Sequence, residues 1–273
     1  GEGHSFVRHS RESHERKSVP HPACERMALR MWDTVYGVDF SAIYDRKWVG
    51  WTDRTWPAIL AMVKERNPEA RTWLDLCCGT GRLLKRASLA GYEVTGVDRS
   101  PHQLRHARRN APDVRLVRAD IRRYTLGRRF DVVTCMFDSI NYLIGRSDWI
   151  RALRNARNHL GPDGIFIFDV NTPYGHRRHW CSTGVVRDSS SFTTMETSYD
   201  PGKGLARARI SGFRKMRRQW HQFDEMHVQR SWPDSTLGAM IRTAGMTFRR
   251  YGSPPFKPPS PSSSRIFYVC RLG

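Results

Sequence analysis

The sequence contains no run of about 18 apolar residues, no C-x-x-C pair and few acidic residues. The first absence predicts that no helix spans a membrane. The second argues against a zinc site or a disulfide framework, although six of the 273 residues are cysteines. No metal is therefore expected. Residues 1–22 are polar and lack the apolar segment of a signal peptide, so we expect a disordered leader and a cytoplasmic location.

Acidic side chains are scarce relative to basic ones. The chain has 26 Asp and Glu against 46 Lys and Arg, which gives a formal net charge of +20. A charge of this size attracts nucleic acid or anionic substrates through long-range fields. The basic residues are mostly arginines and are spread along the chain, however, so an arginine-rich solvated surface is the simpler explanation. Charge alone identifies no partner.

The middle of the chain alternates between short apolar runs and longer helical patterns. The expected helices lie at about 23–36, 56–66, 81–90, 101–110 and 147–160. The expected strands lie at 72–76, 93–97, 114–117, 130–135 and 164–168. Because these runs are apolar and rich in β-branched residues, they are typical of parallel strands covered on both faces. The pattern predicts an α/β fold with a Rossmann-like, doubly wound sheet.

A different pattern follows, in which polar and apolar residues alternate from about 185 to 232. This predicts antiparallel strands inserted before a last helix at about 234–244 and strands at about 247–251 and 265–270. We expect four parts: a leader (1–22), N-terminal helices with a nucleoside-binding core (23–180), an antiparallel β insertion (181–232), and a final helix and strands that complete the core sheet (233–273). We hypothesise that the insertion and the N-terminal helices form a lid over the substrate.

The most informative motif is Leu74-Asp75-Leu76-Cys77-Cys78-Gly79-Thr80-Gly81, in which a strand enters a glycine turn and then a helix. Glycines let the backbone approach a ligand, and the helix N-terminus presents free N–H groups. A dinucleotide fingerprint requires a third glycine at the position of Leu84. Asp75 would repel a pyrophosphate and favour an ammonium group. The motif thus argues against NAD and for a cationic nucleoside that carries an amino acid, although the glycines could also form a simple tight turn.

Acidic residues follow the next strands as well. Asp98 can accept both hydroxyls of a ribose, or it can cap the helix that follows Pro101. Asp120 can accept from an adenine amino group while Ile121 covers the ring. Residues 136–142 lie at the end of the fourth strand. Because ligands of such sheets bind beyond the carboxyl ends of the strands, the four motifs together predict one nucleoside site.

These motifs resemble those of class I S-adenosylmethionine-dependent methyltransferases, in the small-molecule branch of amino-sugar N,N-dimethyltransferases and glycine N-methyltransferase-like enzymes. The resemblance covers about 36–174 and rests on residues 43–45, 74–81, 96–100, 119–121, 130–133 and 168–171. Residues 223–230 resemble a segment of the antiparallel insertion of that branch. The resemblance implies S-adenosylmethionine as cofactor and a small-molecule acceptor, an amine or a hydroxyl.

The resemblance also implies roles for individual residues. Those expected at the cofactor are Asp75 and Cys77 at the amino group, Gly79 and Gly81 along the methionine, Asp98 at the ribose with Arg99 beside it, Asp120 and Ile121 at the adenine, and Phe137 and Tyr142 near the sulfonium. Residues 47–55 resemble the region at the entry to the site in glycine N-methyltransferases, so Arg54 could pair with the methionine carboxylate. Tyr44, Trp48 and Trp51 could form a cation–π cage or could be core aromatics.

Methyl transfer from a sulfonium depends mainly on alignment of the reacting groups. The polar candidates to orient or deprotonate an acceptor are Asp138, Asn141, Asn171 and His227, although His227 could be structural. His176 and His179 are expected to be solvated.

Two alternative functions remain open. In the first, S-adenosylmethionine is the substrate itself, and the enzyme cyclises it through its own amine. The second is a nucleic-acid methyltransferase or binding protein, against which the chain lacks an Asn-Pro-Pro-Tyr base-flipping motif. Nucleic acid is therefore not the expected partner.

Overall fold

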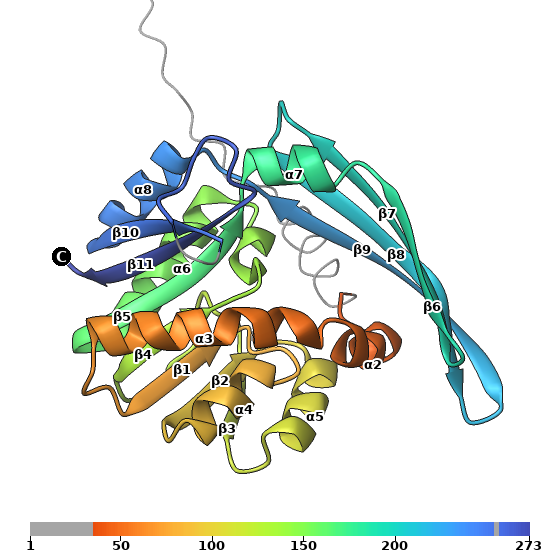
Figure 1. Cartoon of the computed structure of the whole chain (residues 1–273), viewed down its shortest axis with the longest axis horizontal. Coiled ribbons are helices and arrows are strands. Elements are labelled where there is room, and N and C mark those ends of the chain that lie inside the picture. The colour runs from red at the N-terminus through yellow and green to blue at the C-terminus, as the bar shows by residue number, and fades with distance from the viewer. Residues whose placement is uncertain (1–34, 254–256) are drawn as a thin grey trace, which may run out of the picture. The chain divides into compact units, whose positions relative to one another are not determined.

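The computed structural model describes residues 35–253 and 257–273 (Figure 1). The expected leader, and most of the helix expected at 23–36, lie outside the described residues. Two helices, α2 (Val38–Lys47) and α3 (Val49–Arg66), precede the first strand. The sequence pattern did not predict α2, and it placed the start of α3 near Trp56, from the apolar side that Ile59, Leu60, Met62 and Val63 form, whereas the helix begins at Val49. Pro57 lies inside α3.

Seven strands form the main sheet: β1 (Thr72–Leu76), β2 (Glu93–Asp98), β3 (Arg115–Arg118), β4 (Phe130–Cys135), β5 (Leu160–Asn171), β10 (Met246–Gly252) and β11 (Arg265–Leu272). Their order is β10-β11-β5-β4-β1-β2-β3, and β11 runs antiparallel to the other six strands. The prediction of a doubly wound α/β sheet is confirmed. The direction of winding reverses between β1 and β4, which places the expected ligand site at their carboxyl ends.

Helices cover both faces of this sheet: α4 (Arg82–Leu89), α5 (Pro101–Asn110), α6 (Arg146–Asn158) and α8 (Asp234–Thr243). Successive strand residues alternate between two cores, as the pleat requires. Trp73 and Val132 pack with residues of α3, α4 and α5, whereas Leu74 and Val133 pack with residues of α6 and α8. A short 3-10 helix, η1 (Ser139–Tyr142), and α7 (Pro173–His179) follow β4 and β5.

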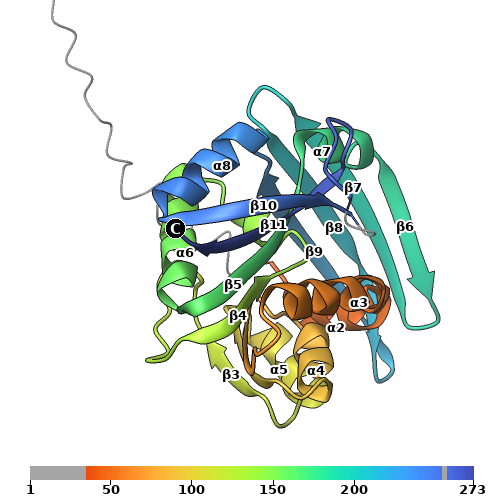
Figure 2. The same cartoon turned by 60° about the vertical axis from the view of Figure 1, so that its left-hand side comes forward.

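The inserted strands form a second sheet, β6 (Thr183–Asp188), β7 (Ser191–Asp200), β8 (Leu205–Met216) and β9 (Gln219–Arg230). They pair antiparallel in sequence order, which confirms the predicted antiparallel insertion (Figures 1 and 2). Phe40 and Ile43 of α2 pack against Ala208, Ile210 and Phe223 of this sheet. Because Asp45 of α2 also pairs with Arg82 of α4 at 3.0 Å, this helix connects the insertion with the helices that cover the main sheet. None of the helices in the described part of the chain has the length and apolarity to cross a membrane.

Candidate functional site

The turn after β1 requires an unusual backbone. Cys77, Gly79 and Gly81 all have positive φ, at 53°, 54° and 78°. A Cβ on Gly81 would lie 3.0 Å from the Cα of Ala107 in α5, so a side chain there would meet both strain and a close neighbour. The N–H of Gly79 donates to Oδ2 of Asp98 across 2.9 Å. The glycine turn is therefore built into the packing and attached to the end of β2.

Asp75 lies in β1 immediately before this turn, and only 3% of the residue is exposed. Burial raises the pKa of its carboxyl to about 7, although a hydrogen bond from Thr134 Oγ1 at 2.7 Å favours the charged form. A buried carboxylate with a raised pKa favours a cationic neighbour, because the cation restores the stability of the charged form. The geometry therefore suits an ammonium group.

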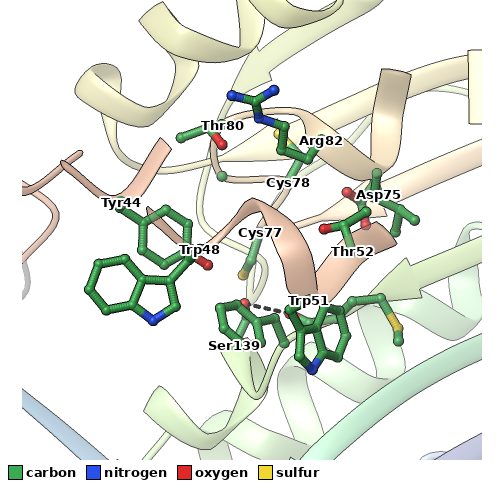
Figure 3. A pocket seen from close by; sticks show the side chains of 14 residues that line it. Tyr44, Trp48, Trp51, Thr52, Asp75, Cys77, Cys78, Thr80, Arg82 and Ser139 are labelled. Atoms are coloured by element: carbon green, nitrogen blue, oxygen red, sulfur yellow. Dashed lines mark hydrogen bonds between the residues drawn. The ribbon is translucent and has the colours of Figure 1, made fainter. Parts of the chain in front are cut away.

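A pocket that is partly open to solvent lies beside Asp75 (Figure 3). Aromatic side chains from α2, α3 and the turn after β4 line it. The rings of Tyr44 and Trp48 stack with a centroid distance of 5.7 Å, and those of Trp51 and Phe137 lie 4.7 Å apart. The remaining lining residues are Thr52, Asp75, Cys77, Cys78, Gly79, Thr80, Arg82, Leu83, Met136 and Ser139.

Two consecutive residues after β4, Phe137 and Asp138, also have positive φ, at 60° and 48°. Asp169 of β5 holds them in place: its two carboxylate oxygens accept the N–H groups of Phe137 at 2.6 Å and Asp138 at 3.0 Å. Arg265 of β11 pairs with both Asp138 and Asp169, and its guanidinium lies 5.5 Å from the Trp51 ring centroid. Asp138 also accepts from Gln229 Nε2 at 2.5 Å. This turn is thus rigidly held beside the pocket.

Sequence reasoning did not single out Asp169 or Arg265. Asp169 lies inside the quoted motif at 168–171, so its position after an apolar strand was an available signal. Arg265 opens the last strand after a loop rich in Pro and Ser, where no local pattern distinguishes it from the other arginines.

Tyr142 and His227 lie together near the pocket. The Tyr142 hydroxyl is 2.7 Å from Nδ1 of His227, and Nε2 of His227 is 3.1 Å from Oε2 of Glu225. The Tyr36 hydroxyl lies 3.3 Å from that of Tyr142, and the Tyr36 ring is 5.4 Å from that of Tyr44. Tyr36 and Glu225 were not among the predicted site residues.

The acids after β2 and β3 already have hydrogen-bond partners. Asp98 Oδ1 accepts the N–H of Ser100 at 2.8 Å, but the cap of α5 is the Ser100 side chain, so the capping alternative for Asp98 is wrong. Asp120 accepts from Arg122 at 2.6 Å, beside the buried Ile121. The described lining of the pocket includes neither acid.

Three further predicted residues, Arg54, Arg99 and Asn141, lie outside the described lining of the pocket. Arg54 is exposed. Arg82, in contrast, lines the pocket and also pairs with Asp45 at 3.0 Å. Arg99 is half-buried beside Asp98. The Asn141 side chain bonds backbone groups of Asn171 and Arg230 at 2.9 to 3.2 Å, so it joins η1 to β5 and β9.

The expectation that His176 is solvated is wrong. The residue is fully buried, because α7 turns it toward β7 and β9, where its Nε2 lies 3.2 Å from Gln229 Oε1. Burial lowers the pKa of His176 to about 4. His179, one turn later in the same helix, is exposed as expected.

Comparisons with known proteins agree with this geometry. Residues 74–164 match a family model described as a methyltransferase domain. The chain is 31% identical to dTDP-3-amino-3,4,6-trideoxy-alpha-D-glucopyranose N,N-dimethyltransferase of Streptomyces venezuelae. The aligned region is 192 residues long and covers 63% of this chain and 81% of that enzyme. Two proteins of known structure are each 25% identical in sequence to this chain. One is a S-adenosylmethionine-dependent methyltransferase from Clostridium acetobutylicum (TM-score 0.74; 92% and 99% of the two chains). The other is DesVI of S. venezuelae (TM-score 0.73; 87% and 100%). The chain belongs to the class I S-adenosylmethionine-dependent methyltransferases.

Proposed function

We propose that this methyltransferase acts on the amine of an amino sugar carried by a nucleoside diphosphate. The observation that carries the proposal is the likeness to the S. venezuelae dimethyltransferase, whose name gives a dTDP-amino sugar as its substrate. That likeness extends over 192 residues and is therefore longer than the methyltransferase-domain match at 74–164. It therefore includes residues outside 74–164, which supports a related acceptor.

The residues of the pocket fit S-adenosylmethionine. The buried Asp75 suits its ammonium group, and the faces of Tyr44, Trp48 and Trp51 suit its sulfonium through cation–π attraction. When bound, the cofactor supplies an electrophilic methyl group. Gly79 and Gly81 would lie along the methionine, with Cys77 contributing its backbone. Arg82, which lines the pocket, replaces the exposed Arg54 as our candidate for the carboxylate.

The ribose and the adenine would lie next to Asp98 with Arg99, and next to Asp120 with Ile121. Each of these two carboxylates already accepts hydrogen bonds from the protein. A carboxylate offers about four acceptor sites, so both can still accept from a nucleoside. Phe137, held by Asp169, would form the wall near the reacting methyl group.

The chain's own contribution to the transfer is alignment. Asp138 is paired with Arg265 and Gln229, and Asn141 is bound to backbone, so we assign both to positioning rather than to proton transfer. The insertion sheet and α2, joined by the cluster around Phe40, would cover the acceptor as a lid. An amine needs only to be neutral and aligned, and proximity supplies most of the rate.

The proposal is tested by incubating the chain with S-adenosylmethionine and dTDP-3-amino-3,4,6-trideoxy-alpha-D-glucopyranose, the sugar in the name of the S. venezuelae enzyme, followed by mass spectrometry. We expect S-adenosylhomocysteine only when the amino sugar is present, together with mono- and dimethylated sugar. Methylation of glycine but not of the sugar would overturn the assignment of the acceptor. Formation of 5′-methylthioadenosine without any acceptor would favour cyclisation of the cofactor, an outcome that the likeness to methyltransferases does not favour. Retention of bulk RNA that falls steeply with salt would revive the nucleic-acid alternative.

A further inference from the structure

Three buried or half-buried side chains form a continuous line of hydrogen bonds. Tyr142 comes from η1, whereas His227 and Glu225 lie two residues apart on β9. The distances are 2.7 Å from the Tyr142 hydroxyl to His227 Nδ1 and 3.1 Å from His227 Nε2 to Glu225 Oε2. The side chains of His227 and Glu225 are only 2% and 5% exposed. This line, which we call the Tyr-His-Glu relay, is therefore shielded from bulk water.

The contacts of Glu225 determine where the hydrogens of the relay lie. Its Oε2 accepts the N–H of Tyr36 at 2.7 Å and its Oε1 accepts the N–H of Gly37 at 2.9 Å. Because this carboxylate accepts at both oxygens, the contact with His227 places a hydrogen on Nε2 of the imidazole. In a neutral imidazole the other nitrogen, Nδ1, is then an acceptor. The hydroxyl of Tyr142 consequently donates to His227.

The relay lies next to the aromatic pocket. The ring of Tyr36 is 6.2 Å from that of Tyr142 and 5.4 Å from that of Tyr44, which lines the pocket. The two hydroxyls of Tyr36 and Tyr142 are 3.3 Å apart, a long contact in which Tyr36 is the donor because the Tyr142 hydrogen points to His227. An N–H of an incoming amine can replace this donor at the Tyr142 oxygen.

An alkylamine is largely protonated near neutral pH, and its ammonium form has no electron pair to attack a methyl group. We propose that the Tyr-His-Glu relay removes this proton. The N–H bond of the ammonium breaks and an O–H bond forms at Tyr142, while the phenolic hydrogen of Tyr142 moves to Nδ1 of His227. The resulting imidazolium is balanced by Glu225, and the amine keeps the electron pair with which it attacks. The inference rests on the proposed function, because it requires an amine acceptor.

The surroundings of the relay agree with this direction of transfer. The titratable groups that face Tyr142 and His227 are Tyr36, Tyr44, Asp138 and Glu225. Asp138 is paired with Arg265, and β8 places the uncharged Ala208 opposite His227. Burial raises the pKa of Tyr142, so its phenol stays neutral and passes a proton on rather than storing charge. His227 is then the group that holds the proton.

The kinetic test compares His227→Gln and Tyr142→Phe with the unchanged chain, using dTDP-3-amino-3,4,6-trideoxy-alpha-D-glucopyranose and saturating S-adenosylmethionine. At about pH 7 we expect kcat to fall about 100-fold in both variants, a typical contribution of general-base catalysis. At about pH 9.5, where an alkylamine increasingly loses its own proton, the loss should shrink to about threefold. His221→Gln, at an exposed position of the same strand, is the matched control and should retain full activity. A loss of the same size at every pH would show a structural role and overturn the relay, as would no loss.

A second measurement does not depend on the acceptor. In the full chain labelled with ¹⁵N-histidine, comparison with His227→Gln identifies the His227 ring signals. We expect the hydrogen on Nε2, and a shift of the Nδ1 signal in Tyr142→Phe. A hydrogen on Nδ1 would overturn the relay even if the chain methylates the amino sugar. If the chain methylates no amino sugar, the proposed function fails. The ring nitrogen of His227 that carries the hydrogen still decides, independently, whether Tyr142 donates to His227 and His227 donates to Glu225 as we infer.

Discussion

Arg265 donates through Nη2 to Oδ1 of Asp138 across 2.6 Å and so ties the last strand to the turn after β4. The same guanidinium pairs with Asp169, which in turn holds the N–H groups of Phe137 and Asp138. Both of those residues have positive φ, a conformation that costs of order 1–3 kcal/mol each and persists only where neighbours impose it. One wall of the aromatic pocket therefore depends on a residue of β11, the last strand.

Replacing this arginine should be costly. Arg265→Met leaves two buried carboxylates without their cation, which destabilises a protein by about 3–5 kcal/mol. Urea unfolding at neutral pH measures the loss, and Arg265→Lys should recover part of it because it keeps the charge without the fork of donors. The matched control is Arg209→Gln, whose partner Asp224 lies on an exposed face of the insertion sheet, and it should hardly change stability. A free energy of unfolding that is the same in Arg265→Met and Arg209→Gln would contradict the assignment.

A second prediction concerns the pH dependence of stability. Folding raises the pKa of Asp75 from 3.8 to about 7, so between these values the folded chain binds a proton that the unfolded chain has lost. This group therefore makes stability fall as pH rises from about 4 to about 7, with no further change above. Asp75→Asn should remove that fall and gain at most about 4 kcal/mol over the unchanged chain above pH 7, at about 1.4 kcal/mol per unit of pKa.

The same substitution should damage the site. Asp75→Asn loses a charged partner for the cofactor ammonium, so calorimetry should show binding of S-adenosylmethionine weakened by about tenfold or more. Asp163→Asn, at an exposed position before the core of β5, should change neither the pH profile nor the affinity. A stability difference between Asp75→Asn and the unchanged chain that is equal at pH 4 and pH 8 would show that Asp75 does not titrate in this range.

The parts of the site that were predictable from sequence are those attached to strand ends. Asp75 lies one residue before the end of β1, Asp98 closes β2 and Asp120 follows β3, and the carboxyl ends of such strands meet at one edge of the sheet whatever lies elsewhere. Of these three acids, Asp75 lines the pocket, whereas the roles of Asp98 and Asp120 stay predictions. Local periodicity also identified the strands of the insertion. The alternation in β8 and β9 shows which residues share a face, and the four buried residues of each twelve-residue strand do lie at alternate positions.

What sequence could not show is which face of the insertion meets the core. The contacts of Glu225 with Tyr36 and of Arg265 with Asp138 join residues 189 and 127 positions apart. They depend on how separate elements pack, for which no local pattern exists. His176 was misjudged for the same reason: a polar residue after a strand is commonly solvated, but here β9 supplies Gln229 as its buried partner.

Cys77 offers a test of a backbone-only role. It has φ of 53°, a conformation that costs an L-residue roughly 1–2 kcal/mol and that glycine adopts freely. Cys77→Gly should therefore leave stability unchanged or raise it by up to about 1 kcal/mol, while the affinity for S-adenosylmethionine stays within about threefold. Cys77→Val, which is β-branched, should lose about 1–3 kcal/mol at the same position. A marked loss of affinity in Cys77→Gly would mean that the thiol itself, not the backbone, contacts the cofactor.

The aromatic pocket should discriminate between the charged cofactor and its neutral product. Trp48 and Trp51 line the pocket, and a sulfonium over an aromatic face gains about 0.5–2 kcal/mol that an uncharged thioether does not. Trp48→Leu and Trp51→Leu should thus weaken S-adenosylmethionine by about 3–30-fold more than S-adenosylhomocysteine in calorimetry. Trp220→Leu, on the insertion sheet and 52% exposed, should change neither affinity. Equal losses for both ligands would indicate that the rings contribute shape and apolar surface, as core aromatics do, rather than cation–π attraction.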